Sequence, residues 1–212
     1  CNTLVTSGDY KTAIFKGPGT FCVSAGSGPL ATGDYLVVAG GGATRSTPDG
    51  ANAGGGAGGF RLSNSVGGIP APTTSPLANP TGLPLSVQGY PITIGGGGAN
   101  PSTIPAGTQA PNGSLSTFDS ITSAGSQGPT PTSGYSGGAG DTPATPIAQG
   151  FPGGAGYDGL STTNNGGGGG GAAVAGANAA CATGGNGGAG SFIACAMIGP
   201  TAPSYGTPGP AT

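Results

Sequence analysis

Six carboxylates are the acids that this chain offers for catalysis, and it has no histidine to act with them. They are scattered along the sequence, and none forms the near pair that acid–base glycoside hydrolysis requires. A serine triad needs a histidine or another base beside its nucleophile. We therefore expect that the protein is not an enzyme. The carboxylates are Asp9, Asp34, Asp49, Asp119, Asp141 and Asp158.

Glycine-rich loops also bind phosphates, so this chemistry has to be weighed. The spacing G-x-G-x-x-G occurs at Gly54, Gly56 and Gly59. A phosphate loop needs glycines followed by Lys-Ser or Lys-Thr at the start of a helix. No helical sequence follows these glycines, and no lysine follows any glycine block. The sequence argues against nucleotide binding, and we expect no cofactor.

The charge balance excludes further classes. The chain has 212 residues with only 4 Lys and Arg and a net charge of -2, which rules out an extended basic surface for nucleic acid or acidic lipid. No apolar run approaches the roughly 18 residues that cross a bilayer, so we expect no membrane insertion. Without histidine or a C-x-x-C pair, we expect no metal site.

Four cysteines allow two disulfides, which would suit a protein outside the cell. They are Cys1, Cys22, Cys181 and Cys195. Burial as small apolar side chains is the equally weighted alternative. Cys181 and Cys195 are the candidate disulfide pair.

Short apolar pieces predict β-strands. The segment 12–25 has apolar residues on both sides of Lys16-Gly17-Pro18-Gly19 and predicts a hairpin. The run at 34–40 predicts a strand that is buried on both faces. The pieces 90–94, 115–124 and 191–199 each predict a short strand, and Asp119 is expected in a turn or at an edge. Glycine and proline dominate the remainder, so we expect no α-helix.

Glycine recurs at every third residue between these pieces. A polyglycine II helix has three residues per turn and no internal hydrogen bonds, so its backbone must bond to neighbouring helices. Glycine along one edge lets two such helices approach closely. We predict a mainly β and irregular fold with a polyglycine II bundle, and a flexible linker is the alternative. The predicted structural glycines are Gly134, Gly137, Gly140, Gly150, Gly153, Gly156, Gly159, Gly184, Gly187 and Gly190.

The composition changes after Gly40, where glycine blocks begin, and this change divides the chain. We predict an N-terminal β-strand region at 1–40 and a glycine-rich domain with polar loops at 41–212. Loops on a rigid scaffold commonly carry function, so the loops 69–84, 100–113 and 141–149 are the predicted recognition surfaces. Their candidate receptor-binding residues are Thr73, Thr74, Asn100, Asn112 and Thr145.

Tyrosines are the polar aromatic residues available for stacking on sugars or docking to a protein. Tyr135 and Tyr157 lie beside glycine blocks, where a loop tip would emerge, and we predict them as receptor-binding anchors. Tyr35 and Tyr90 stand at the head of strands, and we predict that they pack in the core.

A family resemblance rests on the order of several pieces. They are "KTAIFKGPGTFCVSA", "GDYLVVAGGGA", "GGGAGGFR", "YPITIGGGGA", "STFDSITSAGS" and "GGNGGAGS". This order resembles the glycine-rich domain of bacteriophage tail-fibre and related virion proteins of marine and cyanobacterial phages, over residues 11–192. It is also similar to adhesins at fibre tips, where polyglycine II bundles carry variable receptor-binding loops.

The resemblance implies a non-enzymatic virion appendage, outside the cell, that attaches the virus to its host. The implied partners are other copies of the chain in a homotrimer, other virion tail proteins, and a host receptor that is a glycan or an outer-membrane protein. A purely structural capsid decoration, capsid fibre or extracellular filament is the alternative. An ice-binding protein is a third reading, which the irregular proline loops disfavour.

Overall fold

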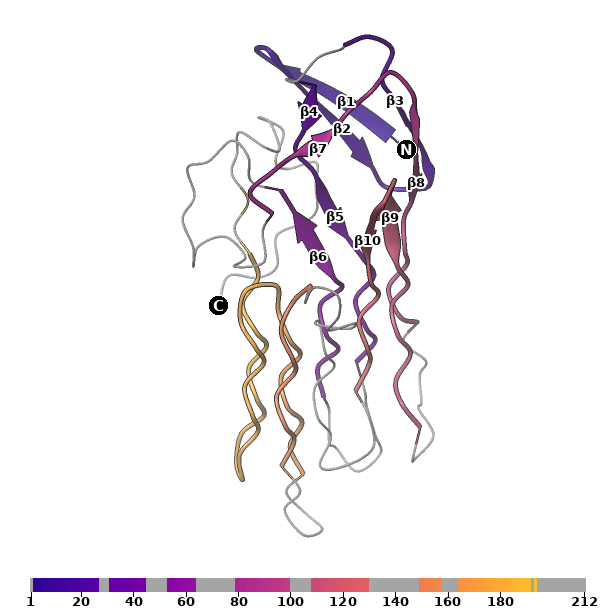
Figure 1. Ribbon diagram of the computed structural model, residues 1–212. Helices are drawn as coiled ribbons and strands as arrows, with labels where there is room; N and C mark the ends of the chain where they lie inside the picture. The colour runs from indigo at the N-terminus through magenta and orange to yellow at the C-terminus, as the bar shows by residue number, and fades with distance from the viewer. Residues whose placement is uncertain are drawn as a thin grey trace.

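The computed structural model describes residues 2–26, 31–44, 53–63, 79–99, 108–129, 149–157, 164–191 and 193. Short strands gather at one end of the molecule, and extended segments run side by side from them to the opposite end (Figure 1). Among these residues there is no helix. The predicted mainly β and irregular fold class is confirmed.

The strands form four small antiparallel sheets. β1 pairs with β2, β4 with β7, and β5 with β6, while the fourth sheet has the order β10-β9-β8-β3. The strands are β1 Asn2–Ser7, β2 Tyr10–Phe15, β3 Gly19–Cys22, β4 Thr32–Gly33, β5 Leu36–Val38, β6 Phe60–Leu62, β7 Leu83–Pro84, β8 Gly89–Thr93, β9 Ser116–Phe118 and β10 Ile121–Ser123.

The side-chain core lies among these strands. Phe21, Tyr90 and Phe118 form an aromatic cluster with ring centroids 6.0 to 6.3 Å apart. Tyr35, Val37 and Ile121 form a second buried cluster, against which Leu83 and Phe118 pack. The predicted packing of Tyr35 and Tyr90 is confirmed, since both are buried.

Three of the strand predictions need correction. The predicted hairpin at 12–25 is wrong, because β2 pairs with β1 and β3 pairs with β8. The strand predicted at 34–40 is buried on one face only, since Val37 is buried while Val38 is 47% exposed. The single strand predicted at 115–124 is a hairpin, β9 and β10, whose turn contains Asp119 at a φ of 51°.

Five strands continue directly into extended segments. β5, β8 and β10 lead into the segments 39–44, 94–99 and 124–129, while 53–59 and 108–115 lead into β6 and β9. The remaining extended segments are 149–157, 164–171, 173–180 and 182–190. Together these nine extended segments form the bundle. The end of the bundle at the strands is the strand end, and the opposite end is the distal end.

Hydrogen bonds between the bundle segments recur every three residues. Ala39 N and Gly42 N donate to Gly59 O and Gly56 O, an antiparallel pair of bonds of 2.9 and 3.0 Å. Gly54 N and Ala57 N donate to Gly167 O and Gly170 O in a parallel arrangement. A three-residue period with bonds only to neighbours is the pattern of polyglycine II, so the predicted bundle is present.

The hydrogen bonds also place the segments in two layers. One layer has the order 182–190, 164–171, 53–59, 39–44, 94–99, and the other has the order 173–180, 149–157, 124–129, 108–115. The segments 173–180, 124–129 and 108–115 each bond to two adjacent segments of the first layer, and 149–157 bonds to 164–171 and, through Gln149 O, to Phe60 N at the start of β6. This offset stacking is that of a hexagonal array, and the segments can be followed across Figure 1 from yellow-orange to magenta.

Inside the bundle the backbones approach too closely for side chains. A Cβ on Gly58 would overlap the carbonyl of Ala39, and one on Gly185 would overlap the carbonyl of Ala177. The neighbour is backbone in each case, so it cannot rotate away. Glycine is therefore a steric requirement at these positions, and the interior of the bundle is mostly backbone, with a few small buried side chains such as Ala43, Ala110 and Ser126.

The predicted division of the chain at residue 40 stays a prediction. The described strands lie on both sides of that residue, because β6 to β10 follow it in sequence and share the strand end with β3 to β5.

Candidate functional site

The distal end is where several bundle segments leave the described structure. Three segments that follow strands reach the distal end at Thr44, Ala99 and Pro129, and the segment 149–157 reaches it at Tyr157. Bonds from Ala43 N to Pro111 O, and from Ala110 N to Pro129 O, hold neighbouring segments together near these points. The scaffold therefore fixes the positions at which several described segments end.

Asn112 lies near the distal end and joins two segments. Its Oδ1 accepts hydrogen bonds from Gly128 N at 3.0 Å and from Gln109 Nε2 at 3.2 Å. Gln109 Nε2 also donates to Gly128 O at 3.1 Å. Asn112 is exposed, and within the described chain its Nδ2 has no partner. An exposed, fixed amide donor of this kind suits a polar ligand such as a sugar.

Tyr157 lies at the distal end of the segment 149–157. It exchanges two backbone bonds with Asn165, of 2.8 and 3.0 Å. Asn165 Nδ2 in turn donates to Ala180 O and Cys181 O at 2.9 and 3.2 Å. Three bundle segments are thus tied together at this residue, and the predicted anchor occupies a fixed position at the distal end.

The hydroxyl of Tyr157 lies beside the Cys181 side chain. The hydrogen bond with the Cys181 side chain, and then the electrostatic interaction with it, raise the pKa of Tyr157 above its ordinary value of 10.0. The physical cause is that a hydrogen bond from the phenol to the sulfur stabilises the protonated form of Tyr157, while negative charge beside it disfavours the phenolate. The contact with Cys181 therefore favours the protonated phenol of Tyr157.

The other predicted receptor-binding residues, Thr73, Thr74, Asn100, Tyr135 and Thr145, lie outside the described residues. The described residues that flank them show where their loops start. Ala99, which precedes Asn100, is at the distal end, whereas Ser63 and Asn79, on either side of Thr73 and Thr74, pair with each other at the strand end. The candidate loops therefore start from opposite ends of the molecule.

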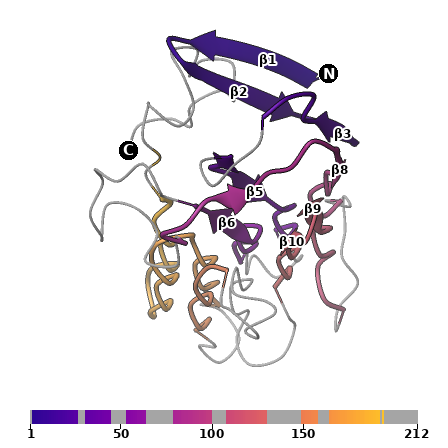
Figure 2. The same ribbon diagram turned by 45° about the horizontal axis from the view of Figure 1, so that its top comes forward.

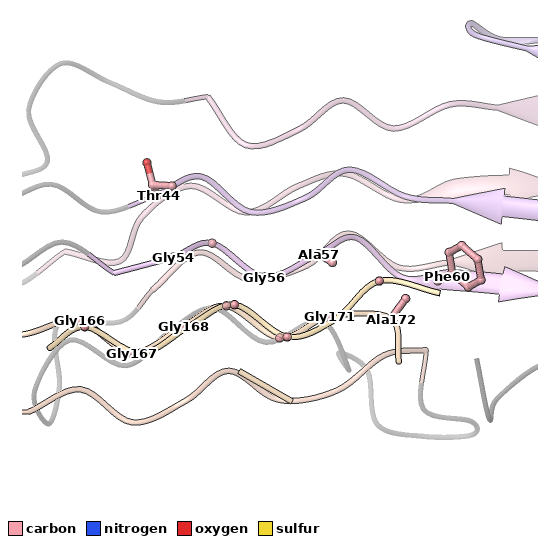
Figure 3. Close-up of a pocket in the computed structure, with 18 of the residues that line it drawn as sticks. Thr44, Gly54, Gly56, Ala57, Phe60, Gly166, Gly167, Gly168, Gly171 and Ala172 are labelled. Carbon is pink, nitrogen blue, oxygen red and sulfur yellow. The ribbon is translucent and has the colours of Figure 1, made fainter. Parts of the chain in front are cut away.

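A groove of about 700 Å³ is lined by residues of the segments 164–171, 53–59 and 182–190. Figure 3 shows Phe60 at its strand end and Thr44 toward the distal end. Apart from these two, the side chains that line it belong to Ala57, Ala172 and Ser191, and the rest is glycine backbone. No acid, base or thiol lines the groove, so its described walls offer shape and backbone polarity without reactive groups.

Comparison with known proteins assigns the chain to a family. A family model described as a glycine-rich domain matches residues 16–210. The chain belongs to the glycine-rich domain family. No curated protein and no solved structure matches it.

In this member of the glycine-rich domain family, the glycines that contact neighbouring segments are not those of the predicted every-third-residue runs. They lie one position away from them in the three-residue repeat. In 182–190, Gly185 N and Gly188 N bond to Gly166 O and Gly169 O. A Cβ on Gly184 or Gly187 would lie 3.5 or 3.9 Å from the nearest atom, and on Gly190 it would meet nothing.

The run in 149–157 behaves in the same way. Phe151 and Gly154 donate to the neighbouring segment, whereas Gly150, Gly153 and Gly156 lie on another edge. Each glycine block has glycine at more than one of the three positions of the repeat. The surrounding segments determine which of these positions packs against a neighbouring backbone. Gly134, Gly137, Gly140 and Gly159 lie outside the described residues.

Buried serines are structural residues that sequence reasoning missed. Ser123 Oγ donates to Gly59 O, and Ser126 Oγ donates to Gly56 O, both at 2.5 Å. Gly42 N donates to Ser126 Oγ at 3.1 Å. Their spacing of three residues, in phase with the bundle, is the signal that could have identified them.

The cysteines and carboxylates do not form a reactive cluster in the described part of the chain. Cys22 and Cys181 are exposed free thiols, and the candidate pairing with Cys195 lies outside the described residues, as does Cys1. Within the described ranges no three histidine, cysteine, aspartate or glutamate residues gather as metal ligands. These ranges also contain no helix of the length and apolarity needed to cross a bilayer.

Proposed function

We propose that this chain is a non-enzymatic component of a virion appendage, a phage tail fibre or adhesin, that attaches the particle to its host. Attachment occurs through the distal end of the bundle, where Asn112 and Tyr157 contact a host surface receptor. The receptor is a glycan or an outer-membrane protein. The protein acts outside the cell, alongside other virion tail proteins and other copies of itself.

One observation supports this proposal: a scaffold bonded through its backbone brings the ends of several described segments to one end of the molecule. Four segments leave the described structure there, at Thr44, Ala99, Pro129 and Tyr157. A rigid scaffold reduces the entropy lost when loops bind. Several copies on one particle then raise weak contacts to a useful avidity.

The chemistry of the distal end favours binding a neutral, polar ligand. Asn112 offers an amide, Gln109 offers a second amide, and Tyr157 offers a phenol that remains protonated. Amide and aromatic groups together are suited to the hydroxyls and apolar faces of sugars. The described residues proposed to bind the ligand, Asn112, Gln109 and Tyr157, are all uncharged types.

Two loop deletions of equal length test the proposal. Removal of 101–106 alters a loop that starts at the distal end, and removal of 71–76 alters one that starts at the strand end. Labelled protein is incubated with a panel of marine bacterial and cyanobacterial cells and with a glycan array. We expect binding to a subset of these surfaces, a tenfold or greater loss for the first deletion, and little change for the second.

Circular dichroism and thermal melting establish that both deletion variants remain folded. Equal binding by both variants would contradict a distal recognition surface. Binding to no cell and no glycan, by a folded protein, would instead favour a purely structural decoration or filament protein.

A further inference from the structure

The N-terminal hairpin stands apart from the other sheets. β1 and β2 form a two-stranded sheet of their own, and in Figures 1 and 2 β1 is the outermost strand, with β2 between it and the rest of the molecule. Within the described chain nothing pairs with the outer edge of β1. An isolated two-stranded hairpin is only marginally stable in water, so a further strand on this edge would stabilise it.

The turn of the hairpin determines which residues of β1 point their backbone groups outward. Gly8 has a φ of 57°, as expected at the first central position of a two-residue hairpin turn. Ser7 and Tyr10 close this turn, and a closing pair is hydrogen-bonded. Because bonded and non-bonded pairs alternate, Asn2, Leu4 and Thr6 direct their N–H and C=O groups away from β2.

The outer edge of β1 has none of the usual protection against pairing. Exposed edge strands are normally guarded by charged residues, proline or a bulge. Asn2–Ser7 contains no charge and no proline, and Leu4 is 63% exposed. The free edge of β2, by contrast, carries the exposed Lys11.

We propose that β1 pairs antiparallel with β1 of a second copy of this chain, about a two-fold axis at Leu4. In this register Leu4 lies opposite Leu4 of the second copy, Asn2 opposite Thr6, and Thr3 opposite Val5. All three outward-directed residues are then bonded, which gives about six backbone hydrogen bonds. The two hairpins become one four-stranded sheet, and the exposed leucines cover each other.

The two-fold symmetry of the proposed contact follows from the difference between the β1 and β2 edges. A two-fold contact uses the same surface on both copies, and the β1 edge is the unprotected one. A head-to-tail contact, which a ring of three copies would need, places β1 against the β2 edge and Lys11. The pairing therefore predicts a dimer, in place of the trimer that the resemblance to tail fibres implies, and it holds whether or not the chain serves in a virion.

Light scattering coupled to size exclusion tests the pairing. We expect the full chain at micromolar concentration to have twice its mass of 19.3 kDa. Leu4→Lys places two like charges opposite each other and should halve the measured mass. Val87→Lys, at a residue that is 56% exposed elsewhere, is the matched control and should remain dimeric. Circular dichroism checks that both variants are folded.

Cross-linking tests the register independently. In a background with Cys1→Ser, Leu4→Cys places two thiols on opposed residues with Cα atoms about 5.5 Å apart, within the range of a disulfide. Thr6→Cys, whose thiols would be offset by four residues, is the control. A covalent dimer for Leu4→Cys alone supports the register. Equal cross-linking, a monomeric wild type, or a trimer unaffected by Leu4→Lys overturns the proposal.

Discussion

The two ends of this molecule fill their interiors by different means. At the strand end, Phe21, Tyr90 and Phe118 contact one another through their rings, and stability comes from apolar area removed from water. In the bundle, Gly58 and Gly185 meet backbone carbonyls with no space for a side chain. The bundle shows that a core can consist of hydrogen-bonded backbone when side chains are absent.

The two interiors should respond differently to substitution. A side-chain core loses stability in proportion to the atoms removed and the cavity left behind. A backbone core has no room for an added atom at its contacts. Its glycines also lose more conformational entropy on folding than other residues do. Each bond between segments contributes about 1 kcal/mol, so the bundle depends on many bonds forming together.

The largest effect is expected where a side chain is added inside the bundle. Gly185→Ala places a methyl group on the Ala177 carbonyl, and because neither backbone can move freely we expect a loss of about 4 kcal/mol or more. Gly184→Ala, one residue earlier, has 3.5 Å of space and should be neutral or stabilising by about 0.5 kcal/mol. Urea unfolding measures both, and similar losses would refute the assigned phase.

Removing a side chain from the strand end should cost somewhat less. Ile121 is 7% exposed and packs with Tyr35 and Val37, so Ile121→Ala should lower the free energy of unfolding by about 3 kcal/mol. Val38→Ala, in the same region but 47% exposed, should cost less than about 1 kcal/mol. Thermal unfolding compares the two, and an equal loss would show that the cluster is not the core.

A buried hydroxyl of the bundle should have an intermediate effect. Ser126→Ala removes the donor to Gly56 O and the acceptor for Gly42 N. Gly42 N and Gly56 O would keep their bond to each other, so we expect the loss of about 1 kcal/mol that is typical of a hydrogen bond. Ser114→Ala, an exposed serine of the neighbouring segment, is the control and should change little. A negligible loss for Ser126→Ala would mean that water replaces the hydroxyl.

The smallest effect concerns proton binding at the distal end. Because the folded-state pKa of Tyr157 is raised, the stability it contributes is fully present below pH 10.0 and is lost as pH rises through the folded value. The difference in phenolate absorbance between wild type and Tyr157→Phe gives the titration of this residue. In a Cys181→Ser background the same difference should shift to lower pH; an unchanged curve would remove Cys181 as the cause.

Much of the architecture could be predicted from local sequence. The apolar run at Leu36–Val38 and the piece "YPIT" predicted β5 and β8, and the three-residue glycine period predicted the bundle. The pairing of β3 with β8 could not be predicted, because Phe21 and Tyr90 are far apart in sequence and the turn Lys16-Gly17-Pro18 resembles a hairpin signal.

The phase of the glycine contacts could not be predicted either. Within blocks where most residues are glycine, the sequence does not distinguish Gly184 from Gly185; only the positions of neighbouring segments do so. At the site, the place of Tyr157 beside a glycine block predicts it as an anchor, and this role stays a prediction. Its partners Asn165 and Cys181 were missed, because each comes from a different segment.

The three-residue hydrogen-bond period also limits how this chain can change in length. Deleting one residue within 164–171 would turn every following residue by a third of a revolution, so that each would meet the wrong neighbour. Deleting three would leave each following residue facing the same neighbouring segment, one turn further along, and would shorten the segment by about 9 Å. The bundle can therefore gain or lose length during evolution only in whole turns, whereas the loops at the distal end can vary by any number of residues.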